Sequence, residues 1–184
     1  MNVMTRPGMS LDEFLIWEAG QEGKWEFDGT GPVEMTGGTR AHALIQRRII
    51  AVLDRLLADT PYEVFGSELK IQVDGRIRYP EAFITKAGGP ADSTVVHDPI
   101  VVFEVISPST EQTDRFTKNR EYAATPSIQR YVMLEQGVIG ATVFARTGME
   151  WIGRLLLADA VLHMPEIGTE VPLAELYTGL FPAA

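Results

Sequence analysis

The chain has 184 residues, of which 45% are hydrophobic and 22% are charged, so it can form one folded domain with a substantial core. It contains no cysteine, which excludes disulfides, thiolate metal sites and a cysteine nucleophile and suits a reducing, cytoplasmic location. The net charge of −9 argues against a surface that attracts nucleic acid everywhere, although a local basic patch could still bind it. No apolar run approaches the ~18 residues of a membrane span, so we expect a soluble, unprocessed protein.

A short amphipathic helix and a β-hairpin are predicted first. Ser10 and Glu13 have the spacing of a capping box, which marks the start of the helix. Residues 24–29 and 32–35 are typical of two short strands around a glycine-rich turn. Alternation places Glu26 on the strand face opposite its aromatic neighbours.

The strongest helix pattern covers residues 39–57. Its apolar side chains form one stripe, and its polar side carries several arginines. His42 lies near the first turn, and Pro61 follows the end of the helix. The histidine could cap, pack or take part in catalysis, and a catalytic role is the minority interpretation.

A β-meander and a polar loop follow this helix. Residues 62–66 and 69–73 read as strands, and Asp74-Gly75 is a typical hairpin turn. We expect residues 76–85 to form the returning strand. A polar loop over residues 87–99 then leads to the next strand.

The segment from Ile100 to Ser107 predicts a strand buried on both faces, because nearly all its side chains are apolar or β-branched. Glu104 lies in the middle of this segment. A carboxylate there must be ion-paired, hydrogen-bonded or bound to a metal, or else stay protonated, because an unpaired buried charge is costly. A structural salt bridge to Lys118 or an arginine is the alternative to a metal site.

The remaining elements complete a mixed architecture. No internal repeat or linker divides the chain, so we expect a single domain over residues 1–184. The order of elements favours an α/β (α+β) fold in which a mixed sheet is flanked by helices. The predicted elements are a helix at about 114–124, strands at 128–134, 139–146 and 150–157, and a short helix at 173–177.

Two acids lie on consecutive, mostly apolar strands. Glu81 alternates with apolar neighbours on the strand 76–85, and Glu104 lies on the next one. If these strands are sheet neighbours, their carboxylates can converge, and a hard divalent cation such as Mg²⁺ would relieve the repulsion. Glu26 is a plausible third acid. By pattern alone, however, Glu26 suits an exposed hairpin position and Glu81 a solvated strand edge.

Lys118 shares one face of the predicted helix with Asp114 and Tyr122, because the three residues recur at helical spacing. A lysine there could meet the two carboxylates or a scissile phosphate. Metal ions with a nearby lysine suit phosphodiester hydrolysis, since the metal activates water and the cations stabilise the developing charge. A solvated pair between Lys118 and Asp114 is the structural alternative.

The ordered series of motifs resembles the Uma-two family of bacterial proteins. The resemblance spans about residues 10–181 and implies a restriction-endonuclease-like, PD-(D/E)XK fold, with a mixed central sheet, flanking helices and additional C-terminal antiparallel strands. The motifs are Trp25-Glu26-Phe27-Asp28-Gly29, His42, Tyr79-Pro80-Glu81, the run from Glu104 to Thr110, and Asp114-Arg115 through Lys118 to Tyr122.

The resemblance also implies a site and a chemistry. Glu81, Glu104 and Glu26 would be the catalytic acids and metal ligands for Mg²⁺ or Mn²⁺, and Lys118 would assist. The substrate would be nucleic acid, DNA in the first place. Two departures from the nuclease pattern are present: Glu81 replaces the usual aspartate after proline, and Ile106 stands where nucleases of this fold carry a lysine.

Two functions therefore remain open. The first is a metal-dependent endonuclease. The second is a catalytically inactive nuclease-fold domain that acts as a homodimeric binding or regulatory module, which the two departures and the acidic net charge favour. In both cases exposed hairpins and terminal strands could pair across a twofold axis, and together with the fold analogy they predict a homodimer.

Overall fold

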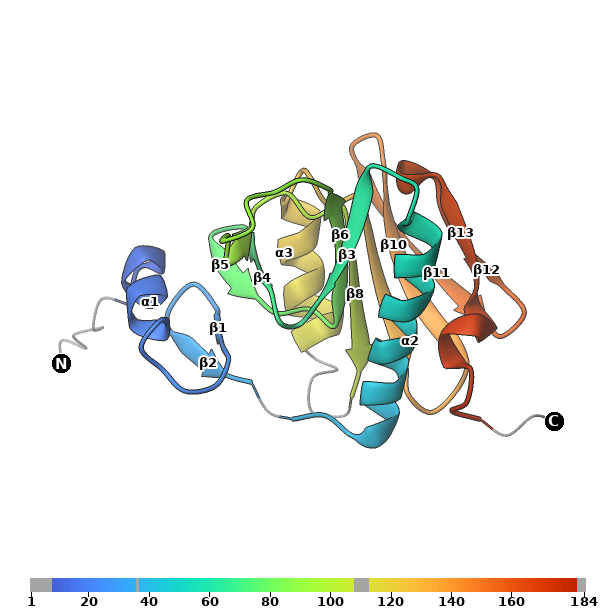
Figure 1. Cartoon of the computed structure of the whole chain (residues 1–184), viewed down its shortest axis with the longest axis horizontal. Coiled ribbons are helices and arrows are strands. Elements are labelled where there is room, and N and C mark those ends of the chain that lie inside the picture. The colour runs from blue at the N-terminus through green and yellow to red at the C-terminus, as the bar shows by residue number, and fades with distance from the viewer. Residues whose placement is uncertain (1–7, 36, 108–112, 182–184) are drawn as a thin grey trace, which may run out of the picture.

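A six-stranded sheet of mixed strand direction forms the centre of the molecule (Figure 1). The structure, a computed structural model, describes residues 8–35, 37–107 and 113–181. Strands β8 and β9 run parallel, and the other neighbouring pairs of this sheet are antiparallel. In spatial order the strands are β11 (Glu150–Leu157), β10 (Gly140–Thr147), β9 (Arg130–Glu135), β8 (Val101–Ile106), β6 (Ala82–Lys86) and β3 (Tyr62–Gly66).

Side-chain alternation in β8 separates the two faces of this sheet. Val101, Phe103 and Val105 pack into the core that helix α2 (Arg40–Leu57) covers. Glu104 lies between them in the sequence, so its side chain points to the opposite face. The buried strand predicted from the sequence is confirmed, and its acid faces away from the larger core.

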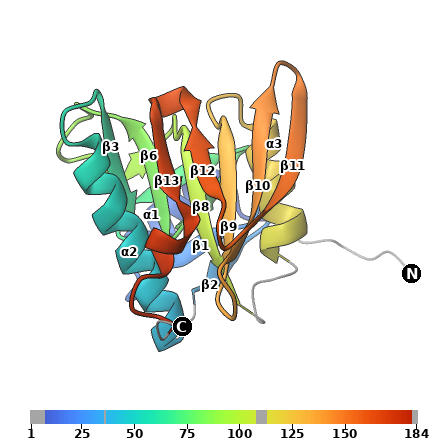
Figure 2. The same ribbon diagram turned by 90° about the vertical axis from the view of Figure 1, so that its right-hand side faces the viewer.

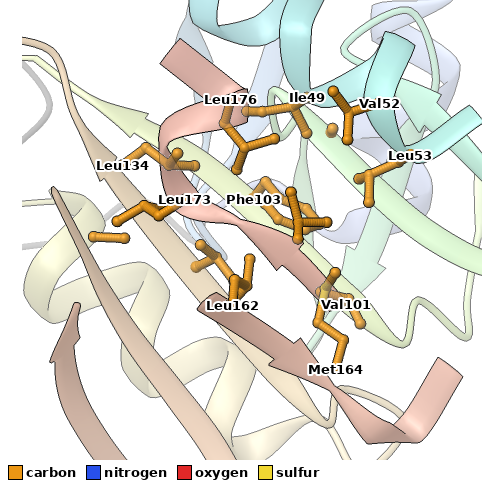
Figure 3. Packing of buried hydrophobic residues seen from close by; sticks show 14 of the residues in the cluster. Ile49, Val52, Leu53, Val101, Phe103, Leu134, Leu162, Met164, Leu173 and Leu176 are labelled. Carbon is orange, nitrogen blue, oxygen red and sulfur yellow. The ribbon is translucent and has the colours of Figure 1, made fainter. Parts of the chain in front are cut away.

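Helix α2 and the C-terminal elements cover the first face of the central sheet (Figure 3). Leu53 from α2, Phe103 from β8 and Leu162 from the C-terminal hairpin belong to one cluster, and each is at most 1% exposed. These contacts place α2 firmly beside the strands that carry the acids. The C-terminal elements are β12 (Val161–Met164), the 3₁₀ turn η2 (Pro165–Ile167), β13 (Thr169–Pro172) and the 3₁₀ turn η3 (Leu173–Tyr177).

A second helical segment covers the opposite face. It begins as a π-helix, η1 (Thr113–Lys118), and continues as α3 (Asn119–Ala124). Tyr122 packs edge-on against Tyr131 of β9, with 4.8 Å between ring centroids. This aromatic contact fixes the helical segment over β8 and β9, next to Glu104.

Helix α1 lies beside a second, five-stranded sheet, whose strands come from both sides of α2 in the sequence (Figure 1). Phe14 of α1 stacks on Phe27 of β1, with 5.1 Å between ring centroids. Ile77 and Tyr79 belong to the same apolar cluster as these two phenylalanines. The elements are α1 (Leu11–Glu18) and, in spatial order, β2 (Pro32–Glu34), β1 (Trp25–Phe27), β5 (Arg76–Arg78), β4 (Lys70–Val73) and β7 (Val95–Val96).

Local signals in the sequence predicted several boundaries correctly. Ser10 and Glu13 form the expected capping box at the start of α1, and the Thr39 hydroxyl caps α2. The Asp74-Gly75 turn joins β4 to β5, with φ angles of 46° and 72°. Positive φ at both central positions is the conformation that this residue pair favours in a hairpin.

The predicted strand over residues 76–85 is wrong as a single element. It divides into β5 and β6, which belong to different sheets. Pro80 lies in the break between them, and a proline cannot donate a main-chain hydrogen bond to a sheet. Glu81 therefore does not share a strand face with Ile77. It lies in the break, directly before the first residue of β6.

Three short strands were not predicted. Strand β7 lies inside the expected polar loop, and β12 and β13 lie in the C-terminal portion that showed no clear strand pattern. The mixed α/β fold with extra C-terminal antiparallel strands is nevertheless the architecture found. Among the described residues, no helix has both the length and the apolar character that crossing a bilayer requires.

Candidate active site

A cavity of about 550 Å³ lies between the β1–β2 hairpin, the start of α2 and the end of β8. Acidic side chains outnumber basic ones in its lining, so the cavity favours cations. The titratable residues lining it are Glu26, Glu34, Glu81, Glu104 and Asp114 on the acidic side, and Lys24, His42 and Lys118 on the basic side.

Glu81 is held in place by α2 and β8 together. His42 Nε2 lies 2.8 Å from Oε1 of Glu81, and the main-chain N–H of Val105 donates to Oε2 at 3.1 Å. Gln46 donates to the main-chain carbonyl of Glu81 at 3.2 Å. The side chain is only 14% exposed, so Glu81 is not the solvated edge residue of the structural alternative.

Glu104 is almost fully buried and paired. Lys118 Nζ lies 2.8 Å from Oε1 of Glu104, and the Tyr122 hydroxyl donates to the same oxygen at 3.0 Å. Burial raises the pKa of Glu104 well above its usual range, Lys118 acts in the opposite direction, and the neighbouring Glu81 raises the pKa further. The two carboxyl groups line the same cavity and lie close enough for the Glu81 charge to act on Glu104.

Lys118 lies among three carboxylates. Besides Glu104, its Nζ atom is 3.2 Å from Oδ1 of Asp114 and 3.5 Å from Oε1 of Glu26. Burial opposes a charged amine, but the three acids outweigh it and raise the pKa of Lys118 well above its usual range. Lys118 is therefore a fixed positive charge, and the pair with Asp114 is buried rather than solvated.

Lys118 is the last residue of a π-helical turn. A π-helix is wider than an α-helix, and single π turns recur at functional sites. Residues 113–118 form this turn, and the Tyr131 hydroxyl donates to the main-chain carbonyl of Asp114 at 3.2 Å. The Ser107 to Thr110 segment of the family motif lies mainly outside the described residues.

Glu26 belongs to a buried ion-pair network and not to the protein surface. Its Oε2 accepts a hydrogen bond from Arg78 at 2.9 Å, and its Oε1 accepts one from the Tyr79 main-chain N–H at 3.1 Å. Burial raises its pKa, but Lys118 and Arg78 outweigh that effect and the net pKa is lowered. Arg78 also binds Glu121 through two hydrogen bonds, of 2.6 and 2.7 Å.

The donor set fits a metal ion held by two protein carboxylates. Within the described ranges, no group of three or more His, Cys, Asp or Glu side chains is arranged to hold a metal. Mg²⁺ does not require such a group, because it keeps several waters and commonly binds through one or two carboxylates together with substrate phosphate. Glu81 and Glu104 would be that pair: among the described residues Glu81 accepts only from neutral groups or His42, and Glu104 faces one lysine, whereas Glu26 is ion-paired with both Arg78 and Lys118.

Sequence reasoning placed four residues in the site, and the structure gathers all of them around one cavity. It did not identify Gln46 or Arg78 as residues that position the acids. A signal for Gln46 was present, because it lies one helical turn after His42 on the same face of α2. Arg78 directly precedes the Tyr79-Pro80-Glu81 motif, but nothing local indicated that it would turn toward Glu26.

The fold places this chain in a structural class that includes a protein described as a putative nuclease. A crystal structure described as "a putative nuclease belonging to DUF820" from Anabaena variabilis has the same fold, with a TM-score of 0.76 and 16% sequence identity. The similarity covers 94% of this chain and 99% of that chain.

The family itself follows from the sequence comparison. The model "Uma2: Putative restriction endonuclease" matches residues 11–169, and the chain belongs to this family. An uncharacterized protein of Synechocystis sp., slr1290, is 30% identical over 178 residues, which cover 95% of this chain and 94% of that protein. Both the restriction-endonuclease-like fold and the family inferred from the motifs are thereby confirmed.

Proposed function

We propose that this protein is a metal-dependent endonuclease that hydrolyses phosphodiester bonds of nucleic acid, with DNA as the first substrate to test. The observation that carries the proposal is that Glu81, just before β6, and Glu104, on the adjacent strand β8, line one cavity beside the buried cation of Lys118. Family membership supports a nuclease and, through the general chemistry of the fold, a divalent cation.

In this proposal Glu81 and Glu104 hold Mg²⁺ or Mn²⁺. The bound cation would lower the pKa of a coordinated water and stabilise negative charge on the scissile phosphate. His42, Gln46 and the Val105 main-chain N–H keep Glu81 aimed at the cavity. Such orientation by neighbouring groups is a usual requirement of metal sites.

Lys118 is the assisting cation. Its charge is permanent, and it lines the same cavity as both acids, so it can contact a phosphate oxygen or orient the attacking water. Lys118 thus supplies the positive charge that is missing at position 106, where Ile106 replaces the lysine of other nucleases of this fold. Glu26 keeps Lys118 in place at 3.5 Å, and Glu26 could act as a third ligand only after exchanging its present partners.

Calorimetric titration of Mn²⁺ tests this proposal when combined with a nicking assay on supercoiled DNA. Wild type should bind Mn²⁺ and nick the plasmid, and Glu104→Gln should lose both properties. Glu34→Gln is the matched control, since Glu34 is an exposed acid lining the same cavity. Absence of Mn²⁺ binding and of nicking in the wild type would refute the proposal.

A second candidate is a nuclease fold without catalysis, serving as a homodimeric binding or regulatory module. The observation that favours it is the existing neutralisation of Glu104 by Lys118, which leaves the buried pair satisfied without a metal. This candidate predicts that Glu104→Gln changes neither the response to metal nor any biological effect of the protein. Loss of a metal-dependent activity in that variant would exclude it.

A further inference from the structure

Strand β11 is a long, open edge of the central sheet. Among the described residues it pairs only with β10, over eight residues from Glu150 to Leu157, and Figure 2 shows both strands at one side of the sheet. The strand contains no proline and no lysine, the residues that commonly protect such edges. An unprotected edge of this length is suited to pair with another strand.

The same edge is unusually apolar for an exposed surface. Ile152, Leu155 and Leu157 are exposed by 36%, 67% and 61%, and Met149, in the turn before the strand, is fully exposed. The other edges of the two larger sheets are different. The five-stranded sheet ends in β2 and β7, which have only three and two residues, and β3 lies beside α2.

The hairpin geometry determines which main-chain groups of β11 are available. Thr147 and Glu150 face each other across the two-residue turn Gly148-Met149. Residues that flank such a turn exchange main-chain hydrogen bonds, so Glu150 and every second residue after it bond to β10. The N–H and C=O groups of Trp151, Gly153 and Leu155 therefore point away from the sheet.

We propose that β11 pairs antiparallel with β11 of a second copy of this chain, around a twofold axis at Ile152. This register satisfies the outward main-chain groups of Trp151 and Gly153, because these two residues meet each other across the axis. It also places Glu150 opposite Arg154 of the second copy, at both ends of the contact. Both charged side chains are exposed in the isolated chain, so they are available for these pairs.

The apolar residues agree with the same register. Ile152 meets its own copy on the axis, and Leu155 lies opposite Met149 of the second copy. Cross-strand pairs of this kind are the unit by which sheets are stabilised. The contact therefore removes from water the exposed apolar side chains nearest its axis.

Charge excludes the neighbouring registers. An axis at Arg154 would place that arginine against its own copy, and like charges directly opposite are destabilising. An axis at Gly153 would set Glu150 against Leu156 and Arg154 against Ile152, which leaves both charges unpaired. Only the axis at Ile152 combines opposite charges with apolar contacts.

The test is the molar mass of the full chain by size-exclusion chromatography with light scattering. Wild type should have twice the chain mass of 20.3 kDa. Glu150→Arg and Arg154→Glu should each be monomeric, because each places like charges opposite one another. The double variant Glu150→Arg/Arg154→Glu should be dimeric again, because it restores both opposite-charge pairs in exchanged positions.

Two further variants secure the result. Arg47→Glu, an exposed charge reversal on α2, should leave the dimer intact. Leu155→Glu, at a site exposed by 67%, should yield a folded monomer, as judged by circular dichroism. A monomeric wild type, or single charge variants that remain dimeric, would overturn the proposal. These outcomes are independent of whether the protein cleaves nucleic acid.

Discussion

His42 and Glu81 are in direct contact, with 2.8 Å between Nε2 of the imidazole and Oε1 of the carboxylate. Burial lowers the pKa of His42, although Glu104 and Asp114 act to raise it. A neutral imidazole with its proton on Nε2 donates to Glu81 and fixes the direction of the carboxylate. His42 is thereby a positioning residue in the site, rather than only a helix cap.

The contact predicts that His42→Ala weakens metal binding. Removal of a group that orients a ligand commonly costs about 10- to 100-fold in affinity, and we expect the Mn²⁺ dissociation constant to rise by that factor. Isothermal titration calorimetry measures the change. His97→Ala, at an exposed position before β8, is the control and should bind as wild type does. Equal affinity of the two variants for Mn²⁺ would show that His42 is not required to orient Glu81.

Glu81→Asp tests the departure from the usual aspartate. Shortening the side chain withdraws the carboxylate by roughly 1 Å, away from His42 and the Val105 N–H. A displacement of that size can cost about 100-fold in rate, so the initial nicking rate at saturating Mn²⁺ should fall by one to two orders of magnitude. Glu34→Asp, in the same cavity, should leave the rate unchanged. An equal or faster nicking rate in Glu81→Asp would contradict the prediction that the site requires the longer side chain.

Lys118→Met should separate metal binding from catalysis. In the structure Lys118 neutralises Glu104, and it also lowers the pKa of that buried acid. Without Lys118 a proton competes with the metal for Glu104, so we expect Mn²⁺ binding to be retained and to strengthen steeply as the pH rises. Nicking should nevertheless fall sharply, because the assisting cation is lost. Calorimetry and the plasmid assay are run on the same preparation. Loss of both Mn²⁺ binding and nicking would contradict this prediction.

Arg78→Leu should destabilise the fold. Arg78 is 2% exposed and neutralises both Glu26 and Glu121, and leaving buried acids unpaired costs about 3 to 5 kcal/mol. Urea denaturation followed by circular dichroism measures the free energy of unfolding. Arg55→Leu is the matched control, because its pair with Glu175 lies at the surface and should contribute less than about 1 kcal/mol. Similar losses in the two variants would argue against a structural role for the buried network.

The elements that sequence reasoning located correctly depend on short-range chemistry. The capping residues Ser10 and Thr39, the Asp74-Gly75 turn and the apolar stripe of α2 act within a few residues of themselves. Such signals keep their meaning wherever the element later packs. The break at Pro80 was missed because alternation continues across it, and only the assignment of β5 and β6 to different sheets reveals it.

The sequence by itself determined the family, the buried strand that carries Glu104 and the helix face that carries Lys118. The strand and the helix face follow from residue type and periodicity, and the family follows from the ordered series of motifs. The tertiary structure alone decided the partner of each acid: Lys118 for Glu104, His42 for Glu81 and Arg78 for Glu26. These contacts join segments distant in the chain, so they depend on strand order and on the packing of α2 and the π-helical turn, which no local pattern encodes.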